Sequence, residues 1–165
     1  MNLRIHESDP SALVASAFRR IERERMAGLP VHNAALEVET VGFRRWSDHW
    51  LGIVVAPWCM SLLLLPGSSG TWIAAPENQR VFHRFPAGDL AFLGSDEPEI
   101  GEYQSCSLFS PMSHFAAQSD AVLTAHAALI ALIRAPEEPA SKLSMNAGGK
   151  TLSSAARRKF LIGNA

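Results

Sequence analysis

Apolar residues near the N-terminus recur at helical spacing. The stripe has clear boundaries: Asp9 suits the cap of a helix, Pro10 its first position, and Gly28 followed by Pro30 its end. Residues three or four positions apart share one face of a helix. The members of the stripe are Leu13, Val14, Ala17, Phe18 and Ile21. The pattern predicts an amphipathic helix between Asp9 and Gly28.

The middle of the chain reads as short strands separated by turns. Predicted strands cover residues 36–43, 50–56, 60–65, 72–75, 81–85, 90–93 and 102–108. Proline and glycine, as in Pro57 and the run that begins at Pro66, interrupt them. Connections this short favour antiparallel neighbours over crossover helices.

A second helix is predicted from residue 119 to residue 134. Ser119 can cap it, Asp120 sits at its positive end, and Pro136 ends it. It is apolar over more than half its circumference, so we expect it to be well buried, with His126 as a core histidine. The predicted fold is α+β: a two-layer sandwich in which an N-terminal and a C-terminal helix cover an antiparallel sheet. Residues 1–135 would form one domain, and residues 136–165 a largely flexible tail with a basic-apolar segment near its end.

The composition limits which partners and which cellular compartment are compatible with the chain. The chain has 165 residues, and 15 basic and 16 acidic side chains give a net charge of −1, which offers no footprint for nucleic acid or an anionic membrane. Its two cysteines, Cys59 and Cys106, lie far apart, as is typical of a reducing compartment. The longest apolar run, residues 59–65, is too short to cross a bilayer, and the N-terminus does not resemble a signal peptide. We expect a cytoplasmic protein without membrane insertion.

Catalytic and metal-binding patterns are weak. None of the six histidines forms a ligand-spaced pair or a Cys/His cluster. Cys106 and His114 are the one pair that could serve a thiol-dependent redox or processing enzyme, which is the alternative to a binding protein. A metal or cluster carrier is a third hypothesis. We predict no catalytic residue, no metal site and no cofactor.

Aromatic residues are more abundant than a core of this size needs. The chain has four tryptophans, of which about two suffice for packing. Tryptophan is enriched in protein-binding surfaces because it offers a large, stiff apolar area. The composition favours a binding protein.

Three blocks of sequence resemble a known family. The first contains Trp50, Gly52, Pro57, Trp58, Ser61, Pro66 and Gly67. The second, YQSCSLFSPMSH at residues 103–114, matches a Y-x-S-C-S-L-x-S-P-x-S-H pattern, and the third is RRKFLIG at residues 157–163. Together they resemble the HybE/HupJ family of nickel–iron hydrogenase maturation chaperones over nearly the whole chain. Cys59 departs from the family, where methionine or another apolar residue is expected.

The resemblance implies a cytoplasmic, non-enzymatic chaperone for assembly of a nickel–iron hydrogenase. Its client would be a subunit precursor, above all the small subunit with its twin-arginine export signal, or in some members the large subunit. The expected client-binding residues are Trp50, Pro57, Trp58, Tyr103, Ser105, Cys106, Ser107, Ser110, Pro111, Met112, His114, Arg157 and Arg158.

Several of these roles stay open at this point. Met112 and His114 are expected to be exposed, and the block at 103–114 is suited to strand addition. The serines could instead satisfy backbone groups, Cys106 could be a buried thiol, and Arg157 with Arg158 could merely keep the tail soluble.

Overall fold

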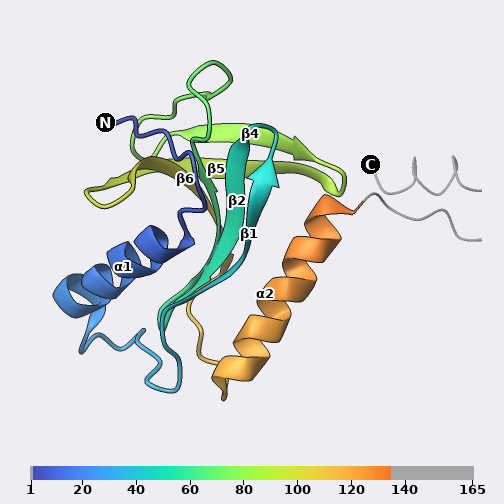
Figure 1. The fold of residues 1–165 in the computed structure, drawn as a ribbon. Helices are drawn as coiled ribbons and strands as arrows, with labels where there is room; N and C mark the ends of the chain where they lie inside the picture. The colour runs from blue at the N-terminus through green and yellow to red at the C-terminus, as the bar shows by residue number, and fades with distance from the viewer. Residues whose placement is uncertain (1, 135–165) are drawn as a thin grey trace, which may run out of the picture. The chain divides into compact units, whose positions relative to one another are not determined.

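Six antiparallel strands form one sheet in the computed structural model, which describes residues 2–134 (Figure 1). The elements are α1 (Ser11–Ile21), the π-helical turn η1 (Glu22–Met26), β1 (Glu39–Trp46), β2 (His49–Val55), β3 (Met60–Leu65), β4 (Arg80–Phe85), β5 (Gly88–Glu97), β6 (Gly101–Phe109) and α2 (Gln118–Ile133). The spatial order is β1-β2-β3-β6-β5-β4. Two three-stranded meanders therefore meet where β3 pairs with β6, and β1 and β4 are the sheet edges.

The two helices cover opposite faces of the sheet (Figure 1). On one face, α2 residues such as Leu129 pack with Leu51 and Leu62. On the other, Phe18 of α1 packs with Leu63 and other residues of alternate parity. The predicted α+β class with an antiparallel sheet and two covering helices is confirmed. The structure adds one difference: the sheet is a middle layer with one helix on each side.

The N-terminal helix follows its apolar stripe. Val14, Ala17, Phe18 and Ile21 are buried, as the spacing predicts, whereas Leu13 is partly exposed. The helix begins at Ser11, one residue later than predicted, and the Asp9 carboxylate accepts a hydrogen bond from the Ser11 amide at 2.8 Å. Apolar burial and this local bond together explain why a helix forms here.

Ion pairs attach the end of α1 to the turn between β5 and β6. The Arg20 guanidinium pairs with Glu97 and Glu99, and Arg25 also pairs with Glu97. Glu97 is buried, and the two arginines are its ion-pair partners there. The pKa of the Glu99 carboxyl is lowered, chiefly by its hydrogen bond from Arg20.

Three predictions about α2 are wrong. The helix begins at Gln118 without a side-chain cap, so Ser119 is not the cap, although Asp120 does lie in the first turn. Leu123 is 67% exposed, Ile130 is 44% exposed and His126 is exposed, so the helix is not deeply buried and His126 is not a core residue. A single sheet face covers only one stripe of a helix, here Ala121, Ala125, Leu129 and Leu132.

The strand predictions differ mainly at two places. The first strand covers Glu39–Trp46 rather than residues 36–43, because Leu36 and Val38 enter the cores before the strand begins. Residues 72–75 are not a strand, and the nearest pairing is one bridge between Glu77 and Gly94. The prediction for residues 60–65 is confirmed without change. Among residues 2–134, none of the helices is both long and apolar enough to span a membrane.

Candidate functional site

The turn between β2 and β3 lies beside the segment that follows β6. Met60 at the start of β3 pairs with Phe109 at the end of β6. Asn33 attaches the loop after η1 to this end of the sheet, because its backbone N–H donates a hydrogen bond to the Pro57 carbonyl at 2.9 Å. The fold thus brings the two predicted blocks, at Pro57–Trp58 and at residues 110–114, to one end of the sheet.

Asn33 also fixes the segment after β6 through its side chain. Its Nδ2 donates to the carbonyl oxygens of Met112 at 3.0 Å and Phe115 at 2.9 Å, and its Oδ1 accepts from the Ala35 amide at 3.0 Å. Sequence reasoning missed Asn33, since a lone asparagine in a loop carries no pattern. Its role is visible only in the fold, where the loop that follows Pro30 comes into contact with Pro57.

A groove of about 340 Å³ opens at this end of the molecule. It is lined by Pro30, Val31, His32, Asn33, Pro111 and Ser113, and we call it the motif-end groove. Val31 is 42% exposed, and neighbouring Leu29 is 45% exposed. The His32 ring lies 2.8 Å from a Glu22 carboxylate oxygen, which places one acidic group beside a groove lined by both apolar and polar residues.

The predicted residues near the groove differ in exposure. Ser110, Pro111 and His114 are exposed, so the expectation for His114 is confirmed. The expected exposure of Met112 is wrong: its side chain is fully buried in the larger core cluster. Pro57 is buried as well. Packing in the core cluster therefore holds Met112 inside and leaves its neighbours at the surface.

The position of β6 rules out strand addition at the block 103–114. Residues 103–109 of the block lie in β6, which already pairs with β3 on one side and β5 on the other. Tyr103 is buried against α1, Ser105 and Cys106 are half-buried, and Ser107 is exposed. That interpretation of the block is wrong, because only an edge strand has free backbone groups to offer.

The two predicted tryptophans lie at opposite ends of the sheet and are both partly buried. Trp50 donates its Nε1–H to the His6 carbonyl at 2.9 Å, and the Arg45 guanidinium stands 4.8 Å from the centre of its ring. Trp58 stacks on Phe18 of α1, with ring centres 6.2 Å apart. Both side chains therefore have packing partners. Arg157 and Arg158 lie outside the described residues.

Neither thiol is activated. Burial raises the pKa of Cys59 to about 11 and also raises the pKa of Cys106. His114 packs against Phe109 and Phe115, and within residues 2–134 it makes no hydrogen bond to Cys106. A thiol enzyme needs a lowered pKa and a base within reach, so this geometry argues against the alternative hypothesis. In the same part of the chain, no group of three or more His, Cys, Asp or Glu side chains could hold a metal ion.

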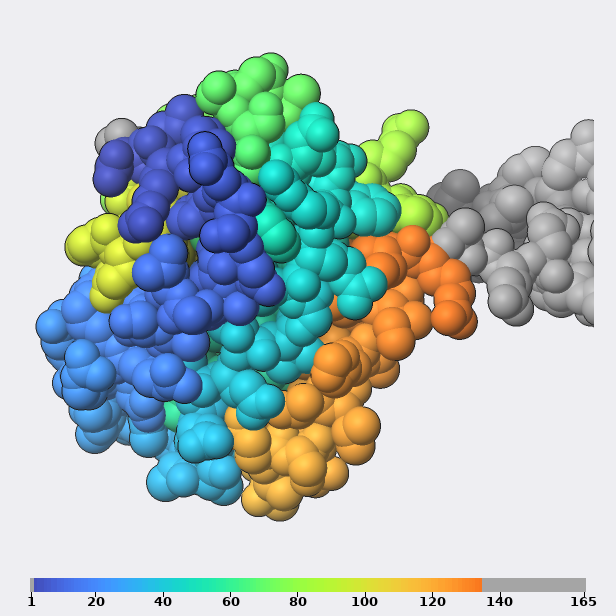
Figure 2. All heavy atoms as spheres, in the orientation of Figure 1, coloured from blue at the N-terminus to red at the C-terminus, as the bar shows by residue number. Residues whose placement is uncertain are grey.

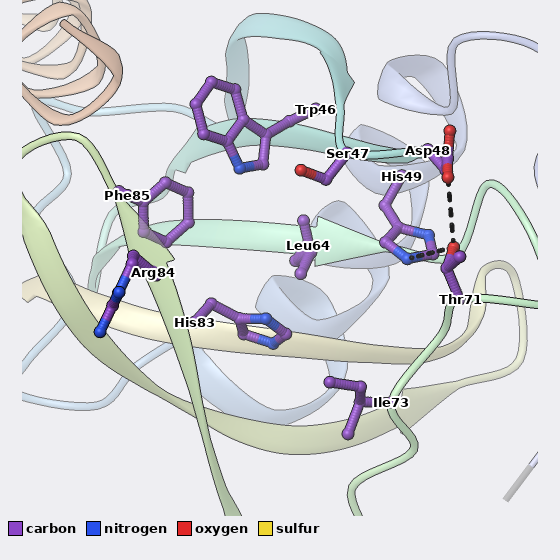
Figure 3. Close-up of a pocket in the computed structure, with 10 residues that line it drawn as sticks. All are labelled: Trp46, Ser47, Asp48, His49, Leu64, Thr71, Ile73, His83, Arg84 and Phe85. Atoms are coloured by element: carbon purple, nitrogen blue, oxygen red, sulfur yellow. Dashed lines mark hydrogen bonds between the residues drawn. The ribbon is translucent and has the colours of Figure 1, made fainter. Parts of the chain in front are cut away.

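A second hollow, of about 330 Å³, lies between β4 and the turn that joins β1 to β2 (Figure 3). We call it the edge cavity. Its lining residues are Trp46, Ser47, Asp48, His49, Leu64, Thr71, Ile73, His83, Arg84 and Phe85. Trp46 and Phe85 stack with ring centres 5.5 Å apart, so they close one end of the gap. Sequence reasoning missed this cavity because its two walls are almost forty residues apart.

Two histidines set the polar groups of the edge cavity. Gly67 donates its amide N–H to Nδ1 of His49 at 3.1 Å, so the proton of that ring is on Nε2, which faces Thr71. Burial lowers the pKa of His49, in agreement with a neutral ring. His83 donates from Nε2 to the Gln104 amide oxygen at 2.6 Å, and Gln104 in turn donates to the Ile73 carbonyl. Both rings are therefore held in fixed orientations.

The described residues thus form a sheet with an apolar groove at one end and a cavity at one edge, an arrangement suited to holding part of another protein. A family model described as "[NiFe]-hydrogenase assembly, chaperone, HybE" matches residues 9–163. The chain belongs to this family of hydrogenase assembly chaperones.

Individual relatives agree with the family assignment. The chain is 44% identical over 121 residues to the hydrogenase expression/formation protein HupJ of Bradyrhizobium diazoefficiens, covering 73% of this chain and 70% of that protein. It is 39% identical over 144 residues to the protein HoxT of Cupriavidus necator, covering 81% and 80%. The solution structure of HybE from Escherichia coli is similar in fold, with a TM-score of 0.67 and 24% identity over 82% of this chain and 83% of that one.

Proposed function

We propose that the protein is a cytoplasmic chaperone that binds the precursor of a hydrogenase small subunit, with its twin-arginine signal, before assembly and export. Membership of the hydrogenase assembly family supports the class of client. In this proposal residues 1–135 act as the chaperone domain, and the tail at 136–165 adds a basic-apolar segment. The protein itself performs no catalysis.

The observation that carries the proposal is the motif-end groove. The family-like block at 103–114 ends in its wall, at Pro111 and Ser113, and the exposed side chains of Leu29 and Val31 continue it. Exposed apolar surface of this kind is typical of protein-binding sites. A subunit that awaits its partner exposes apolar surface too, and an export signal contains an apolar run. The groove would cover such a segment and keep it from aggregating.

Charge at the groove is compatible with a basic signal. Glu22 lies at the rim, where its carboxylate contacts His32. An arginine of the client could pair with this carboxylate while the apolar run that follows occupies the space beside Val31.

A pull-down from cells that make the cognate hydrogenase tests the proposal. The wild-type chain should recover the unprocessed small subunit. Val31→Glu places a charge in the groove, and Ser113→Trp fills it, so each should reduce recovery at least about fivefold, a loss of about 1 kcal/mol of binding free energy.

Leu123→Glu is the matched control, because Leu123 is an equally apolar and more exposed side chain on the outer face of α2. It should leave recovery unchanged. Recovery of no hydrogenase subunit by the wild type would refute the function. Equal recovery by wild type and both groove variants would refute the site.

A further inference from the structure

The strand β4 is a free edge of the sheet. A two-residue turn, Pro86–Ala87, joins it to β5, and Phe85 pairs with Gly88. In such a hairpin the hydrogen-bonded pairs alternate from the turn, so every second residue directs its N–H and C=O away from β5. Those residues are Arg80, Phe82 and Arg84. Within residues 2–134, no loop or turn makes a backbone hydrogen bond to any of these three.

The same three residues form a distinctive row of side chains. Alternation along β4 turns Val81, His83 and Phe85 towards the α2 face and turns the row outward. Phe82 is 68% exposed and lies between two exposed arginines. Arg84 has one weak partner, Asp89, at 3.3 Å between two largely exposed groups. In Figure 2 the β4–β5 hairpin stands out in light green at the upper right of the molecule.

The edge cavity lies directly beside this free edge. Three consecutive residues of β4, His83 to Phe85, form one wall, and four consecutive residues, Trp46 to His49, form the other. Figure 3 shows the His83 ring between Leu64 and Ile73, and the Arg84 side chain pointing to the other side of β4. A chain segment added to β4 would therefore have space for its inward side chains at this position.

We propose that the β4 edge binds an extended segment of the client by strand addition. The backbone of the segment pairs with Arg80, Phe82 and Arg84. One inward apolar side chain enters the edge cavity, and outward acidic side chains pair with the two arginines, on either side of an apolar contact with Phe82. The identity of the client rests on the proposed function, but the chemistry of the segment rests on the edge alone.

A second copy of this chain is a poorer occupant. Antiparallel self-pairing centred on Phe82 would set arginines directly opposite arginines, and like charges opposed across a strand pair are destabilising. Charged edge residues commonly prevent such self-association. The same two arginines favour an acidic partner and disfavour the basic part of an export signal, so this edge and the motif-end groove would hold different parts of the client.

Synthetic peptides and the full-length chain test the proposal. The probe is a fluorescein-labelled ten-residue peptide of alternating valine and glutamate, and its counterpart has lysine in place of glutamate. Fluorescence anisotropy should show the glutamate peptide binding about tenfold more tightly, an advantage that decreases with added salt. The double variant Arg80→Glu/Arg84→Glu should reverse the preference.

Two further variants complete the test. Phe82→Pro removes one outward N–H without touching a ladder hydrogen bond, so it should weaken both peptides while circular dichroism stays unchanged. Arg23→Glu, a charge reversal of an exposed arginine in η1, should leave the glutamate preference unaltered. Equal binding of the two peptides, or an unchanged preference in Arg80→Glu/Arg84→Glu, would overturn the proposal and leave the arginines as guards against self-association.

The pull-down separates this inference from the proposed function. If the proposed function holds and the edge proposal fails, Arg80→Glu/Arg84→Glu will recover the precursor as well as wild type does. If the edge binds the acidic peptide and no hydrogenase subunit is recovered, strand addition stands and the client is wrong.

Discussion

Replacing Asn33 with alanine should loosen the motif-end groove and destabilise the fold. The change removes two hydrogen bonds to carbonyl oxygens, those of Met112 and Phe115, and one from the Ala35 amide. A net hydrogen bond contributes about 1 kcal/mol to stability, and water can replace the bond at exposed Ala35, so the expected loss is about 2 kcal/mol.

Equilibrium unfolding in urea, followed by tryptophan fluorescence, measures this loss. With a denaturant dependence of about 2 kcal/mol per molar urea, the midpoint should fall by about 1 M. Asn33→Asp should cost at least as much, because it keeps the acceptor for Ala35 but directs a carboxylate at two carbonyls. Ser113→Ala is the control: Ser113 is exposed in the same loop, and its loss should change stability by less than about 0.5 kcal/mol. An Asn33→Ala midpoint within error of that control would refute the role of Asn33.

Three other predictions follow from single contacts. Gly94→Ala should lower the thermal midpoint of unfolding strongly, because the added Cβ would collide with the backbone carbonyls of Ala75 and Pro76. Backbone atoms cannot rotate away as the end of a side chain can. A change in the midpoint of under about one degree would contradict the close approach. Burial lowers the pKa of His49 below its ordinary value of 6.5. Below about pH 6.5 the unfolded chain therefore binds more protons at this residue than the folded chain does. The contribution of neutral His49 to folding stability is complete above that pH and is lost as the pH falls. Urea midpoints at pH 7.5 and pH 5 should therefore differ less for His49→Asn than for wild type, and an identical difference would show that His49 does not contribute. Cys106→Ser should leave recovery of the precursor in the pull-down unchanged. Loss of precursor recovery in this variant would support a thiol-dependent mechanism instead.

The elements that the sequence predicts well are those in which local pattern and tertiary position agree. The run Met60–Leu65 is apolar throughout because β3 is central and has a helix-covered face on each side. The stripe of α1 likewise has one sheet face to cover. At β1 the pattern and the position disagree: a bulge between Val41 and Arg44 shifts the register, so alternation misplaces the strand.

The α2 helix shows why burial is harder to predict than helix formation. Its sequence is apolar over more than half its circumference, which normally indicates a well-buried helix. The sheet has only one face to offer it, so Leu123 and Ile130 remain exposed. No local pattern could reveal this, because it depends on how many layers the fold contains.

The candidate site, like the fold, is only partly predictable from the sequence. The sequence identifies the blocks around Pro57 and Pro111, and the structure brings them together. The direction of a side chain after a proline is set by tertiary packing, which is why Met112 is buried and His114 is not. Asn33 and the edge cavity depend on contacts between distant residues, so they were beyond the reach of pattern alone.

The most direct test of the central claim is a titration of the purified full-length chain with purified small-subunit precursor, followed by isothermal calorimetry. The same titration is repeated with a precursor that lacks its twin-arginine signal. The account predicts saturable one-to-one binding of the complete precursor and weaker binding without the signal. Absence of binding to the complete precursor would contradict the proposed function, and equal binding with and without the signal would contradict the role assigned to the motif-end groove.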